Sequence, residues 1–173
     1  MARNKRKVGA GGKPPSKEPS NYDGWLKRAR TIVTDCELCE RFDRFYVAKG
    51  VDAFDRAIAL LPNHPTAWLE KGRLLVLAGA GREPQARAAL RRAVTIDPRN
   101  ARAWMTLGAC ESQGRDLVAA REHLDTAVAL DPEIRHYAPD YYDIPPDLRE
   151  QFFASELSPE LASELASRSR RRI

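Results

Sequence analysis

This chain contains an internal sequence repeat. Ala67-Trp68 recurs as Ala103-Trp104 and Gly72 recurs as Gly108, each 36 residues later. A second set recurs 34 residues apart, with Ala86, Leu90, Ala93 and Asp97-Pro98 returning as Ala120, Leu124, Ala127 and Asp131-Pro132. The two-residue difference falls in residues 79–84, where we expect a longer loop. A period of this size predicts stacked helical hairpins, each of which buries its apolar face only against a neighbour.

Each copy of the repeat contains two stretches with helical spacing of apolar residues. They predict helices over residues 65–78, 83–96, 101–113 and 117–130. Pro98 and Pro132 follow the second helix of each pair, and proline cannot continue a helix. The fold class is therefore all-α, a stack of helical hairpins, or α-solenoid, and the family resemblance given below implies a short right-handed superhelix.

The residues before the repeat predict three further helices. Residues 22–33 form the first, and the Thr34-x-x-Glu37 pattern resembles a capping box that starts a second helix over residues 35–48. Gly50 is expected to end that helix, and residues 52–61 form a third that Pro62 stops. Phe54, Ala57 and Pro62 indicate the end of a degenerate repeat unit.

The two ends of the chain flank this helical body. Lysine, arginine, glycine and proline dominate residues 1–20, which predicts a disordered basic arm. Beyond residue 134 we expect a loop and two capping helices, over residues 146–157 and 159–168. The predicted divisions are 1–20 for the arm, 21–62 for capping helices and the degenerate unit, 63–134 for two repeat units, and 135–173 for the loop, capping helices and basic tail.

Charge is unevenly distributed along the chain. The two ends hold ten basic residues and no acid: Arg3, Lys5, Arg6, Lys7, Lys13 and Lys17 at the start, and Arg168, Arg170, Arg171 and Arg172 at the end. Because the whole chain carries a net charge of +5, the body between these tails carries −5. Short basic tails attract RNA and other polyanions by counterion release.

Composition limits the compartment. No stretch approaches the roughly 18 apolar residues of a membrane-spanning helix, so we expect no membrane partner. The 3 cysteines fit a reducing compartment better than a disulfide framework, which predicts a cytoplasmic protein.

The repeated residues resemble the tetratricopeptide repeat family. That family places a large aromatic residue and then glycine in the first helix of each unit, alanines around a bulky residue in the second, and proline after it. The second unit matches with Trp104, Leu107, Gly108, Ala120, Leu124, Ala127 and Pro132, and the first with Trp68, Gly72, Leu75, Ala86, Leu90, Ala93 and Pro98. Lys71 departs from the pattern, since leucine is usual there.

The resemblance implies a concave face built from the first helix of each unit, which would bind an extended peptide or a partner helix. Ten residues would point there by position: Thr66, Leu69, Arg73, Val76 and Leu77, then Arg102, Met105, Ala109, Ser112 and Gln113. Two alternatives stay open at this stage: the face is ordinary surface, or the chain's own terminus fills it. A clamp for the acidic tail of heat-shock proteins is not favoured, because Glu70 and Thr106 stand where such clamps have asparagine.

Other constellations give no catalytic motif. Cys36-x-x-Cys39 has the spacing of half a zinc site or of a redox pair, but no second pair follows and Cys110 lies in another unit. We expect no catalytic residue, no metal and no cofactor, and interpret the two cysteines as small apolar residues of a helix face.

The sequence thus predicts a non-catalytic adaptor or scaffold that binds a protein segment on its concave face. The alternative is an RNA- or ribosome-associated assembly factor, anchored by its basic tails. So few repeats also leave an exposed terminal face on which a homo-oligomer could form.

The alternative can be tested by deletion. If the tails bind RNA, removing residues 1–17 and 168–173 abolishes RNA retention in a filter-binding assay and leaves the helical circular dichroism signal unchanged. Undiminished RNA binding after the double deletion would contradict it.

Overall fold

The computed structural model describes residues 18–39, 42–79 and 81–136, and these ranges contain helices and no strand. The helices are α1 (Tyr22–Leu38), α2 (Arg44–Leu60), α3 (Pro65–Leu77), α4 (Glu83–Ile96), α5 (Ala101–Gln113), α6 (Leu117–Leu130) and the short 3-10 helix η1 (Pro132–His136). In these ranges no helix has both the length and the apolar character needed to cross a membrane.

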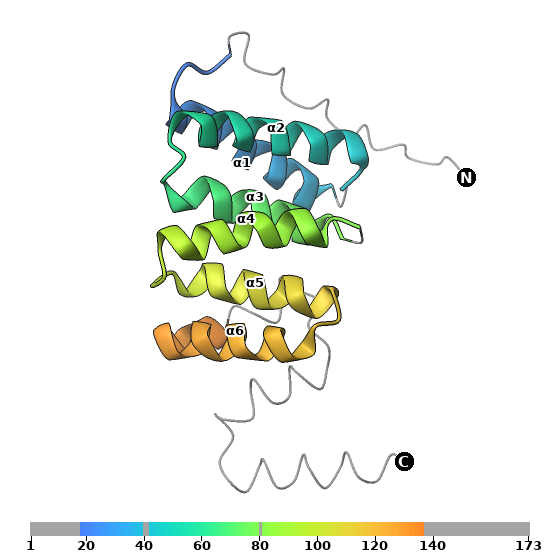
Figure 1. The fold of residues 1–173 in the computed structure, drawn as a ribbon. Helices are drawn as coiled ribbons and strands as arrows, with labels where there is room; N and C mark the ends of the chain where they lie inside the picture. Colours follow the sequence, from blue (N-terminus) through green and yellow to red (C-terminus); the bar gives the residue numbers. More distant parts are fainter. Residues whose placement is uncertain (1–17, 40–41, 80, 137–173) are drawn as a thin grey trace, which may run out of the picture.

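Neighbouring helices pair into three hairpins that stack in chain order (Figure 1). The hairpins are α1 with α2, α3 with α4, and α5 with α6. Each hairpin packs on the next, α2 against α3 and α4 against α5. The first helices also touch one another, α1 with α3 and α3 with α5, and η1 lies against α6 and α5. Helices α1, α3 and α5 therefore form one layer of the stack.

The helices of the repeat lie where the sequence predicts them. Three have the expected bounds, and α3 ends at Leu77, one residue early. Local chemistry fixes their starts: the Asn100 side chain accepts a hydrogen bond from the Ala103 amide, and that of Asp116 from the Ala119 amide. The longer loop before α4 contains Gly79 and Gly81, whose positive φ angles of 75° and 87° suit glycine.

The prediction of three helices over residues 22–61 is wrong, because the structure has two. Thr34 and Glu37 lie inside α1 and do not form a capping box. The apolar face of α1 continues past Val33 to Cys36, which is buried. Helix α1 ends at Leu38, and Asp43 caps α2 by accepting hydrogen bonds from the amides of Phe45 and Tyr46.

Gly50 does not end a helix, as predicted, but lies in the middle of α2. A Cβ atom at this position would lie 2.6 Å from Leu74 Cδ2 of α3, so the missing side chain permits close packing between the first two hairpins. The spacing of Gly50, Phe54 and Ala57 equals that of Ala86, Leu90 and Ala93 in α4. Helix α2 is thus the second helix of a complete hairpin.

Close approach of the two helices in each repeated hairpin depends on a glycine. A Cβ atom on Gly72 would lie 2.5 Å from Leu90 Cγ, and one on Gly108 would lie 2.8 Å from Leu124 Cγ and 3.0 Å from the Ala120 carbonyl oxygen. Both leucines are fully buried. The absent side chain on one helix therefore makes the space that the leucine of the other fills.

One tryptophan links each repeated hairpin to the turn that precedes it. The indole Nε1 of Trp68 donates a hydrogen bond to the Pro62 carbonyl at 2.9 Å, and that of Trp104 donates one to the Pro98 carbonyl at 2.8 Å. The prolines that end one hairpin thereby help to orient the next.

The glycine contact predicts a double-mutant cycle. Gly72→Ala should lower the free energy of unfolding by about 1–2 kcal/mol, because the overpacking cost exceeds the gain in helix propensity. In the Leu90→Ala background the same change should be neutral or stabilising, since the added methyl group enters vacated space. Urea denaturation measures both; an equal cost in the two backgrounds would contradict the contact.

Candidate binding groove

One hollow spans several helices on the layer formed by α1, α3 and α5, and we refer to it as the groove. Its volume is about 780 Å3. Its lining residues are Glu37, Glu70, Arg73, Asp97, Arg99, Asn100, Ala101, Arg102, Met105, Leu130, Asp131 and Ile134. Another hollow, of about 500 Å3, is lined by residues of α1 alone. The groove is therefore the hollow that depends on the stacking of hairpins.

At the α1 and α3 end of the groove, the charges neutralise one another. Arg73 Nη1 lies 2.7 Å from Glu37 Oε1, and its Nε lies 3.2 Å from Glu70 Oε2. Arg30 approaches the other oxygen of Glu70 at 3.4 Å. Burial by itself lowers the pKa of Arg73, but the carboxylates of Glu70 and Glu37 outweigh it and raise the pKa overall. Arg73 is thus a charged residue already committed to partners within the fold.

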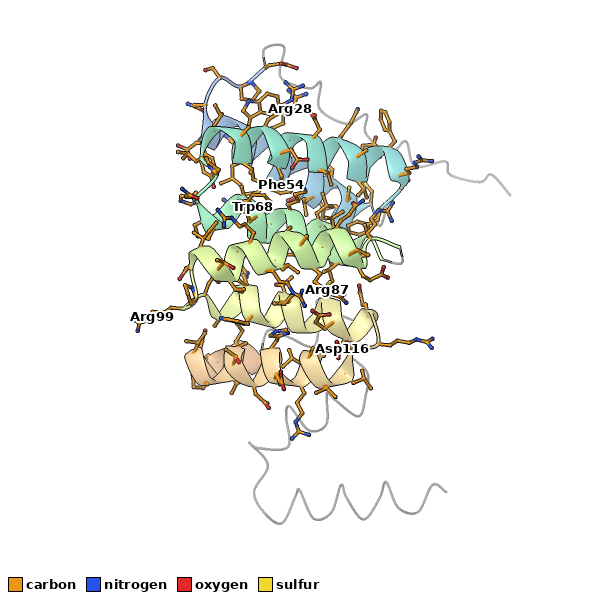
Figure 2. The ribbon with its side chains drawn as sticks, in the orientation of Figure 1. Arg28, Phe54, Trp68, Arg87, Arg99 and Asp116 are labelled. Atoms are coloured by element: carbon orange, nitrogen blue, oxygen red, sulfur yellow. The ribbon has the colours of Figure 1, made fainter. Side chains whose placement is uncertain are left out.

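At the α5 end of the groove, two arginines have no such partner. Arg99 and Arg102 are exposed, and no carboxylate within the described ranges forms an ion pair with either. Arg99 extends outward from the turn between α4 and α5 (Figure 2). Arg102 lies in the first turn of α5, where the helix dipole is also positive. This end of the groove is the place where a ligand carboxylate would gain most.

The two aspartates beside these arginines hold the turns. Asp97 accepts hydrogen bonds from the Arg99 amide at 3.2 Å and from the Asn100 side chain at 3.4 Å. Asp131 accepts one from the Glu133 amide at 3.1 Å. Asp97 therefore shapes the turn from which Arg99 projects, and Asp131 shapes the start of η1.

Apolar side chains lie next to the two arginines. Met105 and Ile134 line the groove and are largely buried, whereas Leu130, the last residue of α6, keeps 40% of its surface exposed. The combination of free guanidinium groups and apolar surface suits a ligand that carries carboxylates beside apolar or aromatic side chains.

The structure brings only part of the predicted concave set into the groove. Of the ten residues, Arg73, Arg102 and Met105 line it. Leu69, Val76, Met105, Ala109 and Ser112 are buried, because neighbouring first helices pack directly on one another. Thr66, Leu77 and Gln113 are half-buried, and the Gln113 side chain donates a hydrogen bond to the Val76 carbonyl at 3.3 Å. Ligand binding by these ten residues remains a prediction.

The sequence reading missed several lining residues. The predicted capping box puts Glu37 at the start of a helix, and this assignment did not indicate that Glu37 lies beside α3. Arg99 lies in the turn between α4 and α5, and Leu130 and Asp131 lie at the end of α6, whereas the family pattern directs attention to the first helices. The Asp-Pro sequences that end the second helices were the available signal, because each is followed by residues at the mouth of the groove.

The other singled-out residues lie apart from the groove. All ten basic tail residues lie outside the described ranges, and polyanion binding remains a prediction.

Cys36 is buried and Cys39 is exposed at the end of α1, and both are free thiols. Burial, with the nearby carboxylates, raises the pKa of Cys36, and burial raises the pKa of Cys110 to about 11. In the described part of the chain, no three His, Cys, Asp or Glu side chains cluster closely enough to hold a metal ion.

Comparison with known proteins identifies the repeat. Residues 77–139 match the tetratricopeptide repeat family model. No sequence among the curated proteins matches the chain. The family model therefore matches part of the repeated region, as the resemblance in the sequence predicted.

Solved structures share the fold. The tetratricopeptide repeat domain of Sgt2 from Aspergillus fumigatus is similar with a TM-score of 0.57 and 16% identity, over 92% of this chain and 88% of that one. A MamA RS-1 ArsTM double mutant gives a TM-score of 0.58 and 21% identity, over 88% and 78%. MamA from Desulfovibrio magneticus RS-1, from residue 41 to its end, gives 0.50 and 20%, over 90% and 96%. These three structures share the helical fold of this chain.

Away from the groove, one carboxylate is buried between α4 and α5. The side chain of Glu111 is 1% exposed; its Oε2 lies 2.6 Å from Arg87 Nη2, and its Oε1 lies 3.4 Å from Arg91 Nη2. Figure 2 shows Arg87 between these two helices. Because a buried charge without a partner is costly, this pair helps to fix how the second hairpin packs on the third.

The pair predicts unequal effects of two arginine substitutions. Arg87→Ala should lower the free energy of unfolding by about 3 kcal/mol, near the low end for a broken buried ion pair, because Arg91 still reaches the carboxylate. Arg121→Ala removes an exposed arginine of α6 that approaches Asp125 at 3.8 Å, and should cost less than about 0.5 kcal/mol. Chemical denaturation compares the two; equal costs would show that the buried pair contributes nothing special.

Proposed function

We propose that this tetratricopeptide repeat protein is a non-catalytic adaptor whose groove holds a segment of a partner protein. One observation carries the proposal: the stacked hairpins form a groove with two arginines, Arg99 and Arg102, that form no ion pair with any carboxylate of the described chain. The fold itself belongs to proteins that bind other proteins or peptides. The groove adds a location and a ligand chemistry to that general role.

The groove favours a ligand with carboxylates close to apolar side chains. Arginine binds carboxylates through paired, charge-assisted hydrogen bonds, which give both affinity and orientation. Apolar or aromatic side chains of the ligand would then cover Leu130, which lies with the largely buried Met105 and Ile134 in the groove lining. A volume of about 780 Å3 accommodates several side chains, which suits a short segment.

Arg73 plays a different part in this proposal from that of the other two arginines. Its guanidinium bridges Glu37 of α1 and Glu70 of α3, so it joins two hairpins across the groove floor. A substitution such as Arg73→Glu would place three carboxylates together and disturb the fold. Binding is therefore better tested with Arg99 and Arg102.

The proposed setting is the cytoplasm. All three cysteines are free and two of them are buried, which fits a reducing compartment. Polyanion binding by the tails, the second function considered, rests on the sequence alone.

A charge-reversal pair tests the proposal. Full-length Arg99→Glu/Arg102→Glu protein should lose a partner that nuclease-treated wild-type protein captures from cells, with at least a tenfold weaker interaction by calorimetry using the mapped segment of that partner. The physical reason is that two attractive charge contacts become repulsive.

The matched control carries the same change in charge elsewhere. Arg44 and Arg115 are exposed, and no ion pair links either of them to the rest of the described chain. The Arg44→Glu/Arg115→Glu protein should retain the partner. If both double variants bind equally well, or both lose binding, the groove is not the site.

A further inference from the structure

The segment that follows η1 begins at the mouth of the groove. Ile134, two residues before the end of η1, lines the groove together with Leu130 and Asp131. Eight extended residues reach about 26 Å, whereas the axes of packed neighbours such as α5 and α3 lie about 8–10 Å apart. A short stretch of chain after residue 136 is therefore long enough to run along the groove from the α5 end to Arg73.

The chemistry of this stretch complements the open end of the groove. Residues 137–144 contain three tyrosines, an isoleucine and the acids Asp140 and Asp143, with no lysine or arginine. The acidic character continues further: residues 137–167 hold seven acids against one arginine. Carboxylates beside aromatic rings are what two unpaired arginines next to Leu130, Met105 and Ile134 would bind.

We propose that residues 137–144 of the same chain are the resident occupant of the groove, with Asp140 and Asp143 meeting Arg99 and Arg102. The tether makes this contact intramolecular, so even weak contacts suffice at the high effective concentration that a short linker gives. A partner segment must then displace the chain's own segment. This last consequence rests on the proposed function, whereas the docking itself does not.

Photo-cross-linking of the full chain tests the docking directly. The residue p-benzoylphenylalanine replaces Tyr141 in one protein and Tyr142 in another, and irradiation at micromolar protein concentration is followed by peptide mass spectrometry. We expect a cross-link within one chain, from at least one of the two positions, to Met105 or to residues 130–134. Cross-links from both positions only to other surfaces, only to a second copy, or to nothing would overturn the proposal.

Charge exchange provides the specific control. Arg99→Glu/Arg102→Glu should reduce the yield of the groove cross-link at least fivefold, and adding Asp140→Lys/Asp143→Lys to that protein should restore it. Arg44→Glu/Arg115→Glu should leave the yield unchanged. An unchanged yield in the Arg99→Glu/Arg102→Glu protein would show that charge complementarity does not hold the segment, and would overturn the assignment.

The cross-link is measured on the isolated protein, so its outcome is independent of any partner. Loss of the cross-link with intact partner capture would reject self-docking and leave the adaptor function standing. A groove cross-link without any groove-dependent partner would support self-docking and reject the adaptor function. If both hold, Asp140→Lys/Asp143→Lys should raise partner affinity about tenfold, because the competing segment is released.

Discussion

In each repeated hairpin, a leucine of the second helix lies against a glycine of the first. Leu90 and Leu124 occupy the space that a side chain at Gly72 or Gly108 would need, with distances of 2.5 Å and 2.8 Å from the hypothetical Cβ atoms to the leucine Cγ atoms. This contact sets how close the paired helices come, and hence the shape that each hairpin offers to its neighbour. A similar contact joins two hairpins, where Leu74 of α3 packs against Gly50 of α2.

Stacking hairpins of this shape produces two regions of different electrostatic character along one groove. Near α1 and α3, Arg73 forms ion pairs with Glu37 and Glu70, and these pairs help to hold the hairpins together. Near the start of α5, Arg99 and Arg102 remain available. The first set stabilises the platform and the second offers ligand contacts. The proposed adaptor function and the proposed resident segment both follow from this division.

The sequence was sufficient for the architecture where residues repeat in phase. The bounds of α4, α5 and α6 follow from alternating small and bulky residues and from the prolines that end each unit. It was misleading over the first hairpin, where Thr34 and Glu37 imitate a capping box and Gly50 imitates a helix end. Tertiary packing decides both cases: the buried face of α1 continues through Cys36, and Gly50 is buried against Leu74.

The groove could be predicted less well than the fold, for a physical reason. A family pattern records which positions face a neighbouring helix, but exposure depends on how closely consecutive first helices pack. Here Leu69 and Val76 are buried, although their positions suggested a ligand surface. Some residues of the open end, such as Arg99, come from turns, whose direction depends on caps such as Asp97. Turn geometry of this kind is not visible in helical periodicity.

The most direct measurement of the central claim is hydrogen–deuterium exchange of the full-length protein, alone and saturated with a captured partner. The account predicts slower exchange on binding in residues 97–105 and 130–134, with little change in the part of α4 that faces away from the groove. Protection confined to α2, α4 or the outer part of α6, with residues 97–105 unaffected, would contradict binding in the groove.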